Sequence, residues 1–315
     1  MADDDSLAAL GEFTVIDRLV AGRVQPASVV LGPGDDAALV HADGLFAVST
    51  DMLVQGRHFR LDWSTPHDIG RKAIAQNAAD IEAMGGQASA FVVAFGAPGD
   101  TPAAASVELA DGMWAEAKKF GAGIVGGDLV QAPQWVISVT VFGGLGGRAA
   151  VRRSGARAGD VVAVAGELGR SAAGFALWSK EIERFPELRR RHLVPEPPYG
   201  QGAVAADAGA TAMTDISDGL LADLGHVAAA SGVAIDVIRA ELEVDAGALT
   251  EAAELAGDDA WAWVLGGGED HALVATFPGA VPAGWRVIGR VLDGSPGVFV
   301  DGAQWSGSQG WESFD

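Results

Sequence analysis

The chain contains no cysteine, and this absence removes several classes of chemistry at once. Disulfides, thiolate nucleophiles, zinc-thiolate sites and iron-sulfur clusters are all excluded. The absence also fits a reducing compartment. Lysine is scarce, and the four that are present are Lys72, Lys118, Lys119 and Lys180. None of the four follows a glycine loop with the spacing of a P-loop, so a Walker-type nucleotide site is excluded.

Positive charge is in short supply, with 21 basic residues against 42 acidic ones and a net charge of -21. Such a surface repels nucleic-acid backbone and anionic membrane, so we expect neither as a partner. Residues 129–147 carry no charge, but Pro133 and several glycines break them into strand-like pieces rather than a membrane span. The N-terminus is acidic where a signal peptide would be basic. We therefore expect a soluble, cytoplasmic protein that meets any polyanionic substrate locally.

The length of 315 residues, 49% of them hydrophobic, suggests two domains with a core each. The chain has 44 glycines, many at the ends of apolar runs, which indicates tight joints between strands and helices of an α/β fold. Strands are expected near residues 29–31, 37–40, 45–49, 88–95, 123–125, 135–142, 160–165, 211–216, 233–237, 271–277, 285–291 and 297–300. Helices are expected near residues 11–21, 65–84, 102–120, 171–179, 200–208 and 219–230. We place the domain junction within 143–159.

Acidic residues recur where predicted strands end or glycine loops turn. They are Asp35, Asp36, Asp51, Asp128, Asp215 and Asp218. Carboxylates brought together repel one another and lose hydration when buried, so such a cluster needs cations. Oxygen-only ligands suit magnesium, which usually arrives with substrate phosphates. The pattern therefore predicts chemistry on a nucleotide phosphate.

Asp80 is predicted to lie on the inward stripe of a helix. Ile69, Ala73, Asn77 and Asp80 recur at intervals of four and three and share one helical face. A carboxylate there needs a partner, either a metal ion or an arginine in a buried salt bridge, and we favour the metal.

Other signals leave two interpretations open. Asp218 is either a metal ligand or the N-cap of the helix that follows. Gly-Asp at 34–35 and 127–128 is also ordinary turn chemistry. His58 either contacts a substrate phosphate or is a surface histidine. The stretch 266–270, three glycines followed by two acids, is either a substrate contact or a strained turn.

Seven short motifs, taken in order, resemble the thiamine-monophosphate kinases. They lie at residues 34–38, 49–54, 77–85, 126–128, 152–156, 215–220 and 266–270. The resemblance spans nearly the whole chain. It implies a two-domain fold like that of aminoimidazole ribonucleotide synthetase, α/β of the α+β type, with mixed sheets covered by helices. It also implies ATP and thiamine monophosphate as substrates, several Mg²⁺ ions and a homodimer.

The resemblance further assigns domains and residues. Residues 1–148 would bind ATP and magnesium and form the dimer, and residues 149–315 would complete the nucleotide and substrate site. The implied magnesium ligands are Asp36, Ser49, Thr50, Asp51, Asp80, Asp128, Asp215 and Asp218. The implied ATP contacts are Gly127, Asp128, Arg153 and Ser217, and the implied thiamine contacts are His58, Glu269 and Trp311. The expected catalytic members are Asp51, Asp128 and Asp218.

Other functions remain open at this level. The chain is alternatively a cyclising or amide-activating ATP enzyme of the same superfamily, a metal-dependent phosphohydrolase, or a nucleotide-binding regulator without catalysis. The selenophosphate synthetases and the hydrogenase-maturation proteins rely on a cysteine or selenocysteine, so the absence of cysteine argues against both.

Overall fold

The computed structural model describes residues 5–33, 37–41, 44–308 and 310. The chain forms two compact units. The first comprises residues 1–81 and 87–147, and the second comprises residues 82–86 and 148–315.

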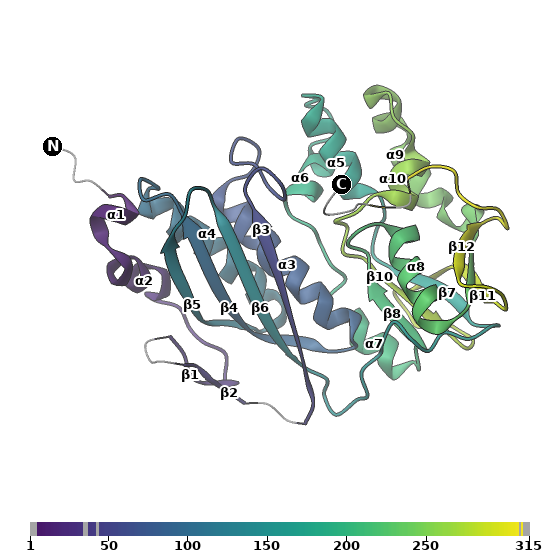
Figure 1. Ribbon diagram of the computed structural model, residues 1–315, viewed down its shortest axis with the longest axis horizontal. Helices are drawn as coiled ribbons and strands as arrows, with labels where there is room; N and C mark the ends of the chain where they lie inside the picture. The colour runs from purple at the N-terminus through teal and green to yellow at the C-terminus, as the bar shows by residue number, and fades with distance from the viewer. Residues whose placement is uncertain (1–4, 34–36, 42–43, 309, 311–315) are drawn as a thin grey trace. The chain divides into compact units, whose positions relative to one another are not determined.

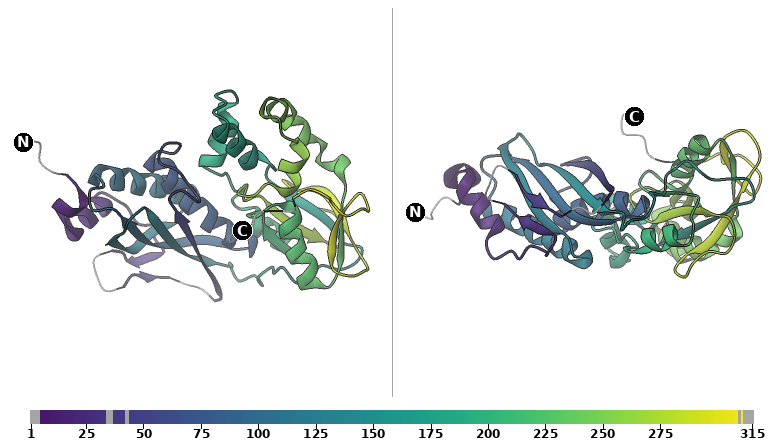
Figure 2. Two further views of the ribbon diagram at one scale, coloured as in Figure 1. Left: turned by 45° about the horizontal axis from the view of Figure 1, so that its top comes forward. Right: turned by 90° about the horizontal axis from the view of Figure 1, so that it is seen from below.

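The first unit contains a four-stranded sheet in the order β3-β6-β4-β5 (Figure 1). The strands are β3 (Phe46–Val54), β4 (Gln87–Ala97), β5 (Gly123–Gln131) and β6 (Val136–Gly144). β6 pairs antiparallel with β3 and β4, while β4 and β5 are parallel. Helices α3 (Pro66–Ala83) and α4 (Ala103–Ala117) lie on one face of the sheet, as the views in Figures 1 and 2 agree.

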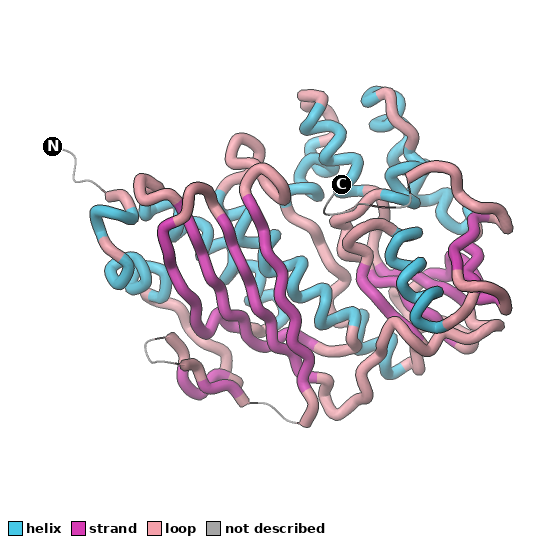
Figure 3. Tube along the Cα trace, in the orientation of Figure 1, coloured by secondary structure: helices cyan, strands magenta, loops and turns pink. Residues whose placement is uncertain are grey.

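Smaller elements flank this sheet. They are the helices α1 (Leu7–Leu10) and α2 (Glu12–Val20), the strands β1 (Val29–Leu31) and β2 (Leu39–Val40), and a short 3-10 helix, Lys118–Phe120. β1 and β2 pair with each other as a separate two-stranded sheet (Figure 3).

Sequence explains where α3 begins and how closely it approaches α4. Thr65 and Asp68 form a reciprocal cap, because the Asp68 amide donates to Thr65 Oγ1 and the Thr65 hydroxyl donates to the Asp68 carboxylate. Two glycines then remove side chains from the helix contact. A Cβ at Gly70 would lie 2.1 Å from the Leu109 carbonyl oxygen, and one at Gly112 would lie 1.9 Å from that of His67.

The second unit is built on a six-stranded sheet in the order β12-β9-β11-β7-β10-β8. The strands are β7 (Val161–Ala165), β8 (Ala212–Asp215), β9 (Ala234–Val237), β10 (Leu273–Phe277), β11 (Arg286–Leu292) and β12 (Gly297–Val300). All neighbours are antiparallel except β12 and β9, which are parallel. The helices are α5 (Arg170–Ser179), α6 (Pro186–Leu193), α7 (Gln201–Asp207), α8 (Leu220–Ser231), α9 (Glu243–Ala256) and α10 (Ala260–Gly266), with a 3-10 helix at Arg239–Leu242.

Both faces of this sheet are buried, and the period of two along its strands assigns residues to each face. Val162 and Val164 pack into a large core with residues of α5, α8, α9 and α10. Ala163 and Ala165 face a smaller core on the other side, together with Phe277.

Two predicted strands were too short, and the difference matters for the site. β3 was expected to end at residue 49 but continues to Val54, because Met52 to Val54 keep pairing with β6. β5 was expected to end at residue 125 but runs to Gln131. Asp51 and Asp128 therefore lie within strands, so the prediction that they follow strand ends was wrong. The helices α9 and α10 were not predicted.

Candidate active site

In the first unit, β3 and α3 bring three of the predicted magnesium ligands into one cluster. Ser49 and Asp51 are two residues apart on the face of β3 that α3 covers. The Ser49 hydroxyl donates to Asp80 Oδ2 at 2.6 Å. Gln76 Nε2 donates to Asp51 Oδ2 at 3.2 Å. The cluster of Ser49, Asp51 and Asp80 thus joins residues 31 positions apart in sequence.

Asn77 fixes the position of this cluster. Its side chain is fully buried, with Nδ2 donating to the Ala73 carbonyl within the helix and Oδ1 accepting the Asp51 amide at 3.2 Å. The predicted inward stripe of α3 is confirmed at this residue. A hydroxyl and two carboxylates are hard oxygen donors, and this donor set fits Mg²⁺.

Thr50 lies on the opposite face of β3. Its hydroxyl donates to the Val139 carbonyl at 2.9 Å and accepts from Thr140 Oγ1 at 3.2 Å, across β6. Successive side chains of a strand point to opposite faces, so Thr50 is separated from Ser49 and Asp51 within one chain.

Asp128 is also separate from the cluster within one chain. β5 is the third strand over from β3, and Asp128 aligns through Ala94 and Ser138 with Met52. At about 4.8 Å between strands, this places it roughly 14 Å from β3. Met52 and Asp128 are both exposed, on the face away from α3. The expectation of a single acidic cluster including Asp128 is not met within the first unit.

Gly127 and His58 have defined local roles. A Cβ at Gly127 would lie 2.1 Å from the Val93 carbonyl oxygen, so the glycine permits close packing of β5 on β4. His58 is exposed in the loop after β3, and its Nδ1 accepts the Val54 amide at 3.0 Å. In the neutral imidazole the proton therefore lies on Nε2, where it is a donor. Asp36 and Trp311 lie outside the described residues.

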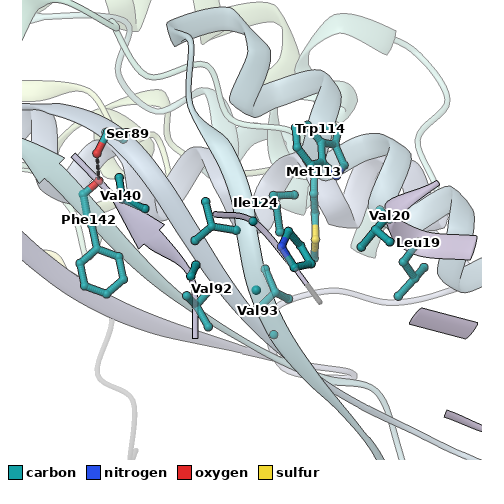
Figure 4. A pocket seen from close by; sticks show the side chains of 18 of the residues that line it. Leu19, Val20, Val40, Ser89, Val92, Val93, Met113, Trp114, Ile124 and Phe142 are labelled. Carbon is teal, nitrogen blue, oxygen red and sulfur yellow. Dashed lines mark hydrogen bonds between the residues drawn. The ribbon is translucent and has the colours of Figure 1, made fainter. Parts of the chain in front are cut away.

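A cavity of about 1480 Å³ in the first unit has walls from α2, α4, β4, β5 and the β1–β2 region (Figure 4). Its labelled side chains include Val92, Met113, Trp114 and Ile124. Gly126, Gly127 and Asp128 also line it. This mostly apolar wall suits a flat heterocycle better than a phosphate chain.

In the second unit, the loop after β8 and the loop before β10 lie side by side. The Glu269 amide donates to the Ser217 carbonyl at 2.7 Å, and the His271 amide donates to the Ile216 carbonyl at 2.9 Å. Asp215 ends β8, and its Oδ2 lies 3.1 Å from His271 Nδ1. The predicted residues Asp215, Ser217 and Glu269 are therefore brought together.

Glycines at 266–268 make this approach possible. A Cβ at Gly268 would lie 2.5 Å from the Ser217 carbonyl oxygen, and one at Gly219 would lie 2.7 Å from that of Gly266. Glu269 and His271 have positive φ angles of 62° and 52°. Backbone strain of this kind concentrates at ligand sites, so the strained turn and the substrate contact are compatible here.

Asp218 is not the helix N-cap that one interpretation expected. Gly219 occupies the N-cap position, and the amides of Asp218 and Gly219 both donate to Asp223 Oδ2. Burial raises the pKa of the Asp218 carboxyl, and Asp215 raises it further, whereas His226 and Arg153 lower it. Arg153 Nε donates to Thr214 Oγ1 at 3.2 Å.

Several residues were missed from the sequence: Asp223, His226 and His271 in this region, and Gln76 in the first unit. Burial raises the pKa of Asp223 to about 7, and Asp215 adds to this effect. A signal for Asp223 was present, since it lies on the apolar stripe of Leu220, Leu224 and Val227. It is the same signal that pointed to Asp80.

Known proteins resemble this chain over nearly its whole length. Residues 34–145 match the family described as AIR synthase related protein, N-terminal domain, and residues 157–301 match its C-terminal domain. A thiamine-monophosphate kinase of Mycobacterium tuberculosis is 69% identical over 99% of this chain and 94% of its own length. One of Corynebacterium glutamicum is 44% identical over 100% of this chain and 96% of its own length. A solved structure described as "AaThiL complexed with AMPPCP and TMP" is 31% identical, covers 97% of both chains and has a TM-score of 0.78.

Both family matches, together with the mixed sheets and helices of the two units, define an AIR synthase-related protein. The fold class that was expected from the sequence is therefore confirmed. The relatives narrow the class. The chain belongs to the thiamine-monophosphate kinase family, and the resemblance drawn from its motifs is confirmed. In the described part of the chain, no helix is long and apolar enough to span a membrane.

Proposed function

We propose that the chain transfers the γ-phosphoryl group of ATP to the phosphate of thiamine monophosphate, in line and without a phosphoenzyme. Family membership supports the substrates. The acceptor phosphate is already an oxyanion near neutral pH, so the reaction needs no strong general base. The observation that carries the proposal is the joining of Ser49, Asp51 and Asp80 across β3 and α3.

The acidic residues would hold magnesium. Asp51 and Asp80, with the Ser49 hydroxyl, form the donor set of the first unit, and Asp215 and Asp218 form that of the second. Bound Mg²⁺ would screen the repulsion between two phosphates and the charge that develops on the leaving group. Gln76 and His271 would orient the carboxylates that they contact, as partners of metal ligands commonly do. Asn77 would hold the backbone of Asp51 through its amide.

Thr50, Asp128 and Asp36 complete the proposed magnesium set. Thr50 and Asp128 lie on the face of the sheet opposite to α3. We propose that they act on the same nucleotide, although one chain does not join them to Ser49. Asp51, Asp128 and Asp218 are the proposed catalytic residues.

For ATP, we assign Gly127, Asp128, Arg153 and Ser217. The cavity beside Gly127 has the size and apolar walls to take the adenine base. Arg153 would add a fixed positive charge for the phosphates, because a guanidinium stays charged at neutral pH.

For thiamine monophosphate, we assign His58, Glu269 and Trp311. The Nε2 donor of His58 suits the phosphate. The Glu269 carboxylate, about one-third exposed, suits the positive charge of the thiazolium ring. Trp311 would contribute an aromatic face.

A homodimer is supported by the face of the first sheet that α3 leaves open. Phe46, Val48 and Met52 alternate along β3 on this face, and each is at least half exposed. Val130 on β5 is 52% exposed. Exposed apolar residues on an open sheet face favour burial against a second copy. We also place the reaction in the cytoplasm, where its co-substrate ATP is made available.

A kinase assay tests the function. The chain is incubated with ATP and thiamine monophosphate, with and without Mg²⁺, and thiamine diphosphate and ADP are quantified. Both products should appear only when both substrates and Mg²⁺ are present. Phosphate released without thiamine monophosphate would instead indicate a phosphohydrolase, and ATP binding without any product would indicate a regulator.

A further inference from the structure

A cluster of three side chains at the start of α8 has the composition of a metal site. Asp218, Asp223 and His226 each present one ligand atom, and the three atoms lie within 4.8 Å of one another. Asp223 and His226 are three residues apart on α8 and so lie on one face of the helix. Asp218 reaches the same point from the loop before the helix.

Asp223 supplies evidence of its own that the cluster has a ligand. The side chain is only 1% exposed. Its Oδ2 accepts the amides of Asp218 at 3.1 Å and Gly219 at 3.0 Å, so a capping role accounts for that oxygen. Its Oδ1 is buried and has no hydrogen-bond partner among the residues that the structure describes. A buried acceptor without a partner is costly, and a bound cation would satisfy it.

The charges around Asp223 also favour a cation. The carboxyl groups of Asp215 and Asp218 both act on Asp223 electrostatically and oppose its negative charge. His271 is hydrogen-bonded to Asp215, and the Asp218 and Gly219 amides already serve Asp223 Oδ2. Further positive charge at Asp223 Oδ1 would offset the remaining repulsion.

The geometry points to a site for a divalent transition-metal ion, such as Mn²⁺, held by Asp218, Asp223 and His226. Magnesium prefers oxygen ligands and rarely takes imidazole, whereas two carboxylates with one imidazole suit a softer ion. Ligand atoms about 2.1 Å from a common ion lie at most about 4.2 Å apart. The ligand atoms lie within 4.8 Å of one another, and the exposed ring of His226 can rotate toward the ion.

This site goes beyond the proposed function. It uses one residue that family resemblance connects with magnesium, Asp218, and adds two that it does not, Asp223 and His226. Since it needs no nucleotide to form, it can be tested without the kinase reaction.

Pulsed electron paramagnetic resonance of bound Mn²⁺ gives the direct test. One equivalent of Mn²⁺ is added to the full chain in excess Mg²⁺ and without nucleotide. We expect a bound ion with nitrogen coupling from imidazole. In His226→Ala the coupling should disappear and the affinity for Mn²⁺ should fall at least tenfold. His41→Ala, which removes an exposed histidine of the first unit, should change neither.

Asp223→Asn separates ligation from folding. The asparagine Oδ1 can still accept the two amides, so thermal unfolding without metal should stay close to that of the unmodified chain, while Mn²⁺ binding weakens at least tenfold. Three results would overturn the site: no Mn²⁺ bound in excess Mg²⁺, bound Mn²⁺ without nitrogen coupling, or coupling that survives His226→Ala. A chain that makes thiamine diphosphate with Mg²⁺ but gives any of these results keeps its kinase function and loses only this site.

Discussion

At the scale of single residues, carboxylates on apolar stripes mark the regions proposed for chemistry. Asp80 on α3 was found this way from sequence, and Asp223 on α8 carries the same pattern. The partners of two other acids, Asp51 and Asp215, were harder to predict. Gln76 and His271 become visible only when β3 packs on α3 and when the two loops of the second unit pair.

Asp270 gives a prediction about pH. Its carboxylate accepts the amides of Gly169 and Ser171 at the start of α5, and burial raises its pKa to about 7. The folded chain therefore holds a proton that the unfolded chain releases near its ordinary pKa of 3.8. Its stabilising contribution is complete below that value and is lost as the pH rises through about 7.

The measurement is urea unfolding at pH 5 and pH 8. Between these values the unmodified chain should lose more unfolding free energy than Asp270→Asn, in which the titrating group is absent. Asp293→Asn, an exposed control, should follow the unmodified chain. Parallel behaviour of all three would show that Asp270 is ionised at both pH values.

At the scale of elements, sequence predicted most helices and strands with bounds close to those observed, and β3 and β5 are the two strands predicted clearly too short. α3 was predictable because its cap and its stripe agree. The full length of β3 was not, since Ser49, Thr50 and Asp51 read as the end of a strand, and only pairing with β6 extends it. α9 was missed although Ala246, Leu249, Ala253 and Ala256 recur at intervals of three and four on its buried face.

Replacement by alanine should have opposite effects at two helical glycines, because Gly70 lies where α3 packs on α4 and Gly247 lies where space is open. Gly70→Ala would place a Cβ 2.1 Å from a backbone oxygen, so we expect destabilisation by about 1–3 kcal/mol. Gly247→Ala, in α9, meets nothing within 4 Å and should stabilise by roughly 0.5–1 kcal/mol. Chemical denaturation of both variants measures the difference. Equal effects would mean that α3 and α4 do not approach as described.

At the scale of the whole molecule, the open face of the first sheet predicts self-association. Replacing Val48 and Met52 by lysine puts two charges on this face without touching a buried residue. The double variant should sediment as a monomer at concentrations where the unmodified chain is a dimer. Val244→Lys, at an exposed apolar residue of α9, should leave the dimer intact. A double variant that remains dimeric would show that the interface does not lie on this face.

The central claim is that the carboxylates on β3 and α3 hold magnesium for phosphoryl transfer. The turnover of Asp51→Asn at saturating Mg²⁺ tests it most directly. Asparagine keeps the size of the side chain and removes its charge, so the strand should fold while the proposed ligand is lost. With saturating ATP, thiamine monophosphate and Mg²⁺, we expect the rate of thiamine diphosphate formation to fall by at least about 100-fold. Turnover equal to that of the unmodified chain under these conditions would contradict the role of the carboxylates on β3 and α3 in phosphoryl transfer.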